Sequence, residues 1–276
     1  MRNAWNYLFL IRFQAQIGTI LLFIPCFLGL IFAKSLTFGN FFLFLTCAFF
    51  ARSVGCILND IADKKIDAKT QTTSHRVIAS GKLSVKNAIL FAIFLVATAF
   101  PLLFLLSKNT FLPLGISAIF VIIYPYSKRF FPIPQAFLGV VYASGFVICA
   151  SHGLDTPFFL LDFNAFLIYI SLILWVIFYD TIYAKRDFAF DKINKVKAST
   201  LFFAKIPLKS LTEMERINLA LIVLCFTSNA IFFLVKPHIF AISCNFFLQI
   251  SSIFAKPSTG FRLNSLCILP MFFLCV

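Results

Sequence analysis

Charged side chains are scarce in this sequence. Asp, Glu, Lys and Arg make up 12% of its 276 residues, about half the share found in an ordinary soluble domain. Hydrophobic residues make up 61%, with 40 Phe among them, and the mean hydropathy is +0.96. A water-soluble core of this size could not bury so much apolar surface. The composition therefore excludes a soluble globular enzyme and predicts one polytopic membrane domain over residues 1–276.

Cysteine pairs are also lacking. The eight Cys lie in or at the ends of apolar segments, without a Cys-x-x-Cys pair and without a His at ligand spacing. Such thiols usually pack as small hydrophobic side chains. The pattern therefore favours free, packed cysteines over a disulfide framework.

Long apolar runs follow one another along the whole chain, and none shows the two-residue alternation of a membrane β-barrel. A run of about 20 apolar residues crosses the roughly 30 Å of bilayer hydrocarbon as a helix, which satisfies its own backbone hydrogen bonds. We therefore predict an all-α bundle of about nine transmembrane helices. The predicted spans are residues 15–34, 38–58, 84–106, 110–127, 133–152, 163–184, 214–235, 238–255 and 261–276.

Positive charge is in excess, with 24 Lys and Arg against 10 Asp and Glu. Such a balance can indicate nucleic acid, anionic lipid or an anionic substrate as partner. With nine spans and the N-terminus inside, only Lys34, Lys108 and Lys236 fall in outer loops. The positive-inside rule then accounts for the charge. We predict a lipid bilayer rather than nucleic acid as partner.

The few acidic residues are concentrated in two clusters at the predicted cytoplasmic ends of the second and sixth spans. Along a continuous helix the spacing within each cluster returns to nearly one face. Like charges on one face repel, so each cluster needs a cation. Nearby lysines and arginines could neutralise them as solvated helix ends. The clusters are Asp60, Asp63 and Asp67, and Asp180, Asp187 and Asp191.

Metal binding is the other interpretation of these clusters. Carboxylates and amides such as Asn59 are hard oxygen ligands, of which Mg²⁺ takes one or two together with water and phosphate oxygens. Two facing clusters therefore indicate a pair of Mg²⁺ sites that hold a diphosphate. Arg76, Lys128 and Arg129 lie on the same predicted face, where they could bind phosphate oxygens.

Both clusters resemble motifs of a known family. Residues 58–67, followed by Arg76 and Ser80-Gly81, resemble the first aspartate-rich motif of the UbiA superfamily of intramembrane prenyltransferases. Asp180, Tyr183, Asp187 and Asp191 are similar to its second motif. Residues 124–129 and 179–184, with Arg12 and residues 17–19, look most like the branch that prenylates 4-hydroxybenzoate. The resemblance covers almost the whole chain and weakens after about residue 235.

This resemblance implies an activity and roles for individual residues. It implies a UbiA-like fold and Mg²⁺-dependent transfer of a polyprenyl group from polyprenyl diphosphate to 4-hydroxybenzoate, in ubiquinone biosynthesis at a bacterial or mitochondrial inner membrane. By motif position, Asp180 and Tyr183 support the metal sites, Arg76 and Lys128 bind diphosphate, and Arg12 and Arg129 bind the benzoate carboxylate or phosphate. The implied metal ligands are Asn59, Asp60, Asp63 and Asp67 for the first ion, and Asp187 and Asp191 for the second.

Two alternatives stay open. Haem farnesylation or prenylation of another quinone precursor would keep both metal sites and change the acceptor pocket. A transporter would carry ionisable residues near the bilayer midplane, where this sequence places only Arg52. The chain also departs from the family pattern at Thr72, Val77, Ala189 and Phe190, which lowers the charge near both motifs.

Overall fold

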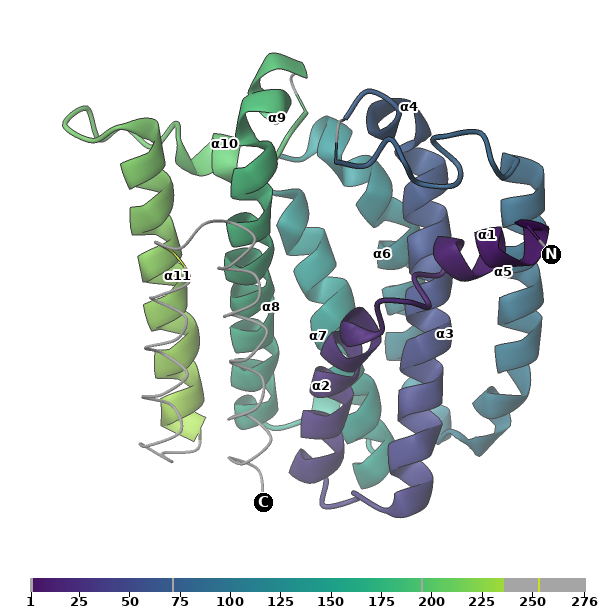
Figure 1. The fold of residues 1–276 in the computed structure, drawn as a ribbon. Helices are drawn as coiled ribbons and strands as arrows, with labels where there is room; N and C mark the ends of the chain where they lie inside the picture. The colour runs from purple at the N-terminus through teal and green to yellow at the C-terminus, as the bar shows by residue number, and fades with distance from the viewer. Residues whose placement is uncertain (1, 71, 195, 236–252, 254–276) are drawn as a thin grey trace. The chain divides into compact units, whose positions relative to one another are not determined.

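Helices make up the regular structure of this protein. A computed structural model describes residues 2–70, 72–194, 196–235 and 253, and every regular element in these residues is a helix (Figure 1). The all-α prediction is therefore confirmed. The chain divides into two compact units, Met1–Tyr126 with Ile148–Phe158, and Ser127–Val147 with Phe159–Val276. The single domain over residues 1–276 stays a prediction.

The first unit contains the N-terminal helices and the first aspartate cluster. It also includes most of α6 (Phe111–Phe130) and the last residues of α7 (Pro134–Leu154). Its other helices are α1 (Arg2–Leu10), α2 (Ile17–Phe32), α3 (Phe38–Ala62), α4 (Lys64–Asp67), α5 (Val85–Ala99), η1 (Phe100–Leu105) and η2 (Lys108–Thr110).

The second unit contains the second aspartate cluster. Most of α7 belongs to it, and the short helix η3 (Phe158–Leu160) lies at the boundary between the units. Its other helices are α8 (Phe163–Ala184), η4 (Lys185–Asp187), α9 (Phe188–Asn194), α10 (Ser199–Phe203) and α11 (Glu213–Val235).

Six helical segments of the described residues are long and apolar enough to cross a membrane, and α2, with 16 residues, is shorter. The six segments and α2 together correspond to the seven predicted spans from 15–34 to 214–235. The predicted span 261–276 and all but residue 253 of the predicted span 238–255 lie outside the described residues, so the count of nine is not confirmed. The six segments are Phe38–Ala62, Val85–Leu105, Lys108–Phe130, Pro134–Leu154, Phe163–Asn194 and Glu213–Ile231.

Polar side chains fix where three of these helices begin. The Thr37 hydroxyl accepts the Asn40 N–H at the start of α3, and Ser84 does the same for Asn87 at the start of α5, each at 3.2 Å. The Asp162 carboxylate accepts an N–H at 2.8 Å at the start of α8. Such caps satisfy backbone donors that the first helical turn leaves free.

The core of the first unit supports the loop between α4 and α5. Leu10, Ile57 and Ile78 are fully buried together, from the end of α1, from α3 and from this loop. The ring of Tyr7 packs edge-on against Phe91 with centroids 4.9 Å apart, which joins α1 to α5. The loop that carries Arg76 is therefore held against α3 by apolar packing.

At the other end of α3, a polar cluster joins three segments of the first unit. The Ser107 N–H donates to Nδ1 of His152 at 3.1 Å, and Nε2 of His152 lies 3.3 Å from the side-chain oxygen of Asn40. Asp155 accepts hydrogen bonds from Ser107 and Asn109, which lower the pKa of its carboxyl. His152 thus has a structural role at the end of α7.

In the second unit, α8 packs against α11. Ser171 and Ser228 exchange hydrogen bonds across this interface, since each hydroxyl donates to the carbonyl of the other residue at 2.9 and 3.1 Å. Small polar residues join membrane helices in this way. The five cysteines among the described residues are all free, as the sequence predicts: Cys26, Cys47, Cys56, Cys149 and Cys225.

Candidate active site

The first aspartate motif crosses a break between two helices. Helix α3 ends at Ala62, Asp63 has φ −88° and ψ 3°, and α4 begins at Lys64. The Asp63 carbonyl accepts both the Ile66 N–H and the Asp67 N–H, at 2.9 and 2.8 Å, which tightens the turn. The prediction of one continuous helix through this motif is therefore wrong. The break nevertheless keeps all three carboxylates buried.

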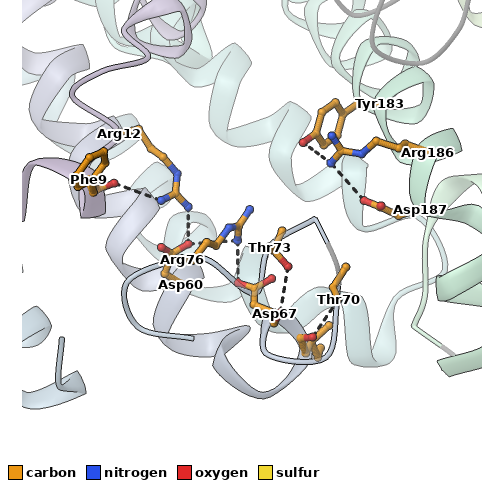
Figure 2. Close-up of polar contacts among 11 residues, drawn as sticks. Phe9, Arg12, Asp60, Asp67, Thr70, Thr73, Arg76, Tyr183, Arg186 and Asp187 are labelled. Carbon is orange, nitrogen blue, oxygen red and sulfur yellow. Dashed lines mark hydrogen bonds and ion pairs between the residues drawn. The ribbon is translucent and has the colours of Figure 1, made fainter. Parts of the chain in front are cut away.

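Two arginines form ion pairs with carboxylates of this motif (Figure 2). Arg12 lies 2.7 Å from Oδ1 of Asp60, and Arg76 lies 3.2 Å from the same oxygen. Nη1 of Arg76 also lies 2.8 Å from Oδ2 of Asp67. The structure thus brings together four of the predicted site residues from α3, α4 and the loops after α1 and α4.

The charges of this cluster are buried and unequal in number. Asp60, Asp63 and Asp67 are 1%, 3% and 6% exposed. Burial alone would lower the pKa of Arg76, but the carboxylates of Asp60 and Asp67 outweigh burial and raise that pKa, so the guanidinium stays charged. Oδ2 of Asp60 is buried and accepts no hydrogen bond within the described part of the chain. Three buried carboxylates around two guanidinium groups can accommodate a further cation.

Arg12 reaches Asp60 from an unusual backbone position. The Arg12 N–H donates to the Phe9 carbonyl and the Phe13 N–H to the Leu8 carbonyl, at 3.1 and 2.9 Å, which is the Schellman pattern of a helix end. Arg12 has φ +56°, the left-handed conformation that glycine usually supplies at this position. For a residue with a Cβ this conformation costs about 1–2 kcal/mol. The end of α1 therefore holds Arg12 in a strained conformation directed at Asp60.

We expect Arg12→Gly and Arg12→Ala to separate this strain from the ion pair. Both variants lose the guanidinium, so both should lose the ion pair with Asp60. Only glycine relieves the left-handed strain, so Arg12→Gly should be more stable than Arg12→Ala by about 1 kcal/mol. Thermal unfolding of the purified variants measures the difference. Equal stability of the two variants would show that the conformation of Arg12 is not strained.

The second motif also crosses a helix break. Helix α8 ends at Ala184, one 3₁₀ turn follows, and α9 begins at Phe188. Asp180 is half-buried near the end of α8, where the Gln135 side chain hydrogen-bonds to it. Lys128, at the end of α6, lies within electrostatic range of Asp180 and Asp191, and Asp187 within range of Asp191. Within this unit the structure therefore groups the predicted acids with the predicted Lys128.

Tyr183 lies beside an arginine that the sequence analysis did not place in the site (Figure 2). Arg186 donates to the Tyr183 hydroxyl at 2.6 Å, and its guanidinium lies 4.3 Å from the centre of that ring. The same guanidinium lies 3.5 Å from Asp187. Gln135 is a second residue that the sequence analysis did not place in the site, and its side-chain oxygen accepts the Ser199 N–H at 3.1 Å. Both residues fix the orientation of motif side chains.

The remaining predicted residues lie at the ends of α3 and α6. Asn59 is half-buried on α3, and its carbonyl accepts the Asp63 N–H at 2.9 Å. Arg129 is exposed in the last turn of α6. Their roles stay predictions. The meeting of the two clusters across one cavity also stays a prediction, because each cluster belongs to a different unit.

Arg52 adds a further cation to the first unit. It is half-buried in the span formed by α3, where it donates to the Ile11 carbonyl at 3.4 Å. A side chain at Gly18 would clash with its guanidinium, so the absence of a Cβ there makes room for Arg52. Cys56 is within electrostatic range of Arg52, Arg12, Asp60 and Arg76. Arg52 is therefore an intramembrane charge next to the first cluster, and such charges usually mark functional sites.

Metal binding by protein side chains alone is not indicated in the residues that the structure describes. No group of three or more His, Cys, Asp or Glu side chains among them is arranged to hold a metal ion. Mg²⁺ commonly takes only one or two carboxylates and completes its coordination with water and substrate phosphates. The buried oxygen set of the first cluster fits that mode of binding.

Apolar helices of membrane length, with clusters of carboxylates and arginines near their ends, indicate an integral membrane protein with charged sites at helix ends. The model of the UbiA prenyltransferase family matches residues 22–274. The chain therefore belongs to this family and is an integral membrane prenyltransferase. Membership of an enzyme family argues against the transporter alternative.

Individual relatives agree with this assignment. The 4-hydroxybenzoate octaprenyltransferase of Actinobacillus pleuropneumoniae serotype 3 (strain JL03) is 33% identical over 226 residues, which cover 81% of this chain and 76% of the relative. The apo structure of a UbiA homolog from Aeropyrum pernix K1 has a TM-score of 0.76 at 20% identity, and covers 93% of this chain and 96% of its own. A UbiA homolog from Archaeoglobus fulgidus bound to GPP and Mg²⁺ has a TM-score of 0.67 at 17% identity. The match covers 98% of this chain and 99% of the homolog. At these identities the two solved structures support the fold.

Proposed function

We propose that this protein transfers a polyprenyl group from polyprenyl diphosphate to 4-hydroxybenzoate in ubiquinone biosynthesis. The observation that carries the proposal is the buried cluster of Asp60, Asp63 and Asp67 with Arg12 and Arg76. The relative from Actinobacillus, named for this reaction, supports the choice of acceptor. We also propose a bacterial inner membrane, with both motifs at the cytoplasmic face. The exposed Lys64, Lys65 and Lys69 beside the first motif support this orientation.

We propose Mg²⁺ as the cofactor. The fit rests on the buried Oδ2 of Asp60, which accepts no hydrogen bond among the described residues, and on the excess of carboxylates over arginines in the cluster. The Archaeoglobus homolog bound to GPP and Mg²⁺ supports the choice of metal. When bound, Mg²⁺ would neutralise negative charge on a diphosphate leaving group. The residues proposed to hold it are Asn59, Asp60, Asp63 and Asp67 in one unit, and Asp187 and Asp191 in the other.

In the proposed reaction the bond between the prenyl carbon and the diphosphate oxygen breaks. A new bond forms from that carbon to the ring carbon ortho to the phenolic hydroxyl, and a proton leaves that ring carbon. Arg76 and Lys128 would bind the departing diphosphate, whose charge grows as the bond breaks. The allylic cation requires a dry site, which aromatic side chains can line.

For the carboxylate of 4-hydroxybenzoate we propose Arg52. Arg12 and Arg129 were predicted to bind this carboxylate or phosphate. Arg12 pairs with Asp60, a proposed metal ligand, which favours a phosphate role for Arg12. The Arg52 side chain is half-buried, and its guanidinium donates to the Ile11 carbonyl at 3.4 Å. It could take a carboxylate with two parallel hydrogen bonds. The acceptor ring would then lie on the membrane side of the first motif.

Arg52→Gln should raise the KM for 4-hydroxybenzoate by about 10- to 100-fold, because a charged hydrogen bond contributes about 1.5–3 kcal/mol. The KM for polyprenyl diphosphate should stay within about twofold of wild type. Arg52→Lys is the control that keeps the charge, and we expect a smaller increase. A rise in the KM for the diphosphate alone would place Arg52 at the leaving group instead.

The overall proposal is tested by incubating membranes that contain the protein with 4-hydroxybenzoate, polyprenyl diphosphate and Mg²⁺. We expect prenylated 4-hydroxybenzoate, loss of the product when EDTA removes the metal, and recovery when Mg²⁺ is restored. Product detected by mass spectrometry in the presence of excess EDTA would contradict the metal requirement. Failure to form product at any Mg²⁺ concentration would contradict the choice of acceptor.

A further inference from the structure

An apolar groove lies between α3 and α5 in the first unit. Its volume is about 570 Å³. It is lined by Ile89 and Ile93 of α5 and by Phe100 at the start of η1, and Ala92 and Ala97 of α5 leave the space between them open. Ile89, Ile93 and Phe100 are 45%, 59% and 54% exposed. The groove therefore opens at the surface of the unit, and in a membrane protein such a surface faces acyl chains.

The groove does not belong to the side of α3 that carries the first motif. Val54, Leu58 and Ile61 line it with the spacing of one helical face. At 100° per residue, Asp60 lies about 120° around α3 from the centre of that face. Asp60 and its arginines are therefore directed elsewhere, and the groove is a separate site from the one proposed for the prenyl diphosphate.

The length of the groove matches one leaflet of a bilayer. Ile89 and Phe100 are its first and last lining residues on this segment, and a helical rise of 1.5 Å per residue puts them about 16 Å apart. Half of the hydrocarbon core of a bilayer is about 15 Å thick. An acyl chain of the leaflet on the motif side would fill the groove and end with it, whereas a polyprenyl chain of eight units would extend far beyond.

Two lysines continue the groove toward the membrane surface. Lys86 precedes Ile89 by one turn of α5, and Lys65 follows Ile61 by about one turn across the break between α3 and α4. Both lysines are exposed. Within the residues that the structure describes, neither side chain makes a hydrogen bond or an ion pair. They are available to the phosphate of a lipid whose acyl chain occupies the groove.

We propose that the α3–α5 groove binds an anionic phospholipid, with one acyl chain between the two helices and the phosphate beside Lys65 and Lys86. Both lysines favour an occupant that carries a phosphate next to an apolar chain, as a phospholipid does. The site is independent of the proposed prenyl transfer and would hold a lipid of the surrounding membrane.

Native mass spectrometry of the full-length protein in detergent tests this proposal with phosphatidylglycerol and phosphatidylcholine as probes. Wild type should bind phosphatidylglycerol more tightly. Lys86→Gln should weaken phosphatidylglycerol about fivefold, since one lysine near a lipid surface contributes about that factor, and should leave phosphatidylcholine unchanged. Lys108→Gln, outside the groove, is the charge control and should behave as wild type.

A second pair of variants tests the apolar part of the site. Ala97→Phe fills the groove and should remove most binding of both lipids, whereas Thr98→Phe, on the adjacent exposed position, should not. Equal binding of the two lipids by wild type, or full binding by Ala97→Phe, would overturn the proposal. So would an Ala97→Phe variant that binds phospholipid normally but loses polyprenyl diphosphate, because the groove would then hold the substrate chain.

Discussion

Asp60→Asn should lower the rate of prenyl transfer by about 10²–10³-fold or more, the loss that follows removal of one strong electrostatic contact in an active site. The Asp60 carboxylate is shared by Arg12 and Arg76, and its second oxygen is buried without a hydrogen bond among the described residues. The amide of Asn has nearly the same shape but no charge. It would weaken the ion pairs of Arg12 and Arg76 with this position and remove an anionic ligand. Turnover of 4-hydroxybenzoate in membranes measures the loss.

Asp155→Asn is the matched control for this variant. Asp155 belongs to the same unit, but it lies in the polar cluster with Ser107 and Asn109, where its side-chain oxygen accepts hydrogen bonds. The Asn side chain can still accept them, so turnover should stay within about twofold of wild type. Near-normal turnover by Asp60→Asn, with protein levels equal to those of the control, would contradict the role of the first cluster.

Asp191→Asn should lower turnover by a comparable factor and raise the Mg²⁺ concentration required for half-maximal rate. Asp191 lies near Asp187 and Lys128 in the second unit. Loss of its charge would weaken metal binding and alter the charge balance around Lys128, which is proposed to bind diphosphate. A titration of the rate with Mg²⁺ measures both effects.

Glu213→Gln supplies the comparison in the same unit. Glu213 pairs with Lys192 at 2.7 Å, and both side chains are about half exposed. Exposed pairs of this kind contribute about 0–1 kcal/mol to stability, so Mg²⁺ dependence and turnover should match wild type. If Asp191→Asn and Glu213→Gln have the same Mg²⁺ dependence, the metal role of the second cluster is wrong.

The sequence predicts the helical spans well because membrane crossing depends on length and apolar content, which are local properties. The helices α3, α5 and α8 match their predicted spans closely at the ends that hydroxyl or carboxylate caps define. The breaks at Asp63 and at η4 were not predicted. A periodicity of 3.6 residues averages over several turns, so it does not detect a tightened turn of three residues.

Acidic residues are few in this chain, and their clustering predicted the charged residues of the candidate site. It did not predict which of these residues form ion pairs. Arg76 was predicted to bind phosphate, and its contacts with Asp60 and Asp67 depend on how the loop after α4 folds back. Gln135 reaches Ser199 from 64 residues away. Arg186, which contacts Tyr183 and Asp187, was not placed in the site. The sequence did identify Arg52 as the one deep cation, and the role proposed for Arg52 starts from that signal.

We propose that both aspartate clusters bind one diphosphate through Mg²⁺. The most direct measurement is the Kd of polyprenyl diphosphate, at fixed Mg²⁺, for wild type, Asp60→Asn, Asp191→Asn and the double variant. We expect each single variant to weaken binding, and the double variant to lose much less than the product of the two single losses, because the residues act as one unit. If either single variant binds the diphosphate as tightly as wild type, the two clusters do not share it and the claim is wrong.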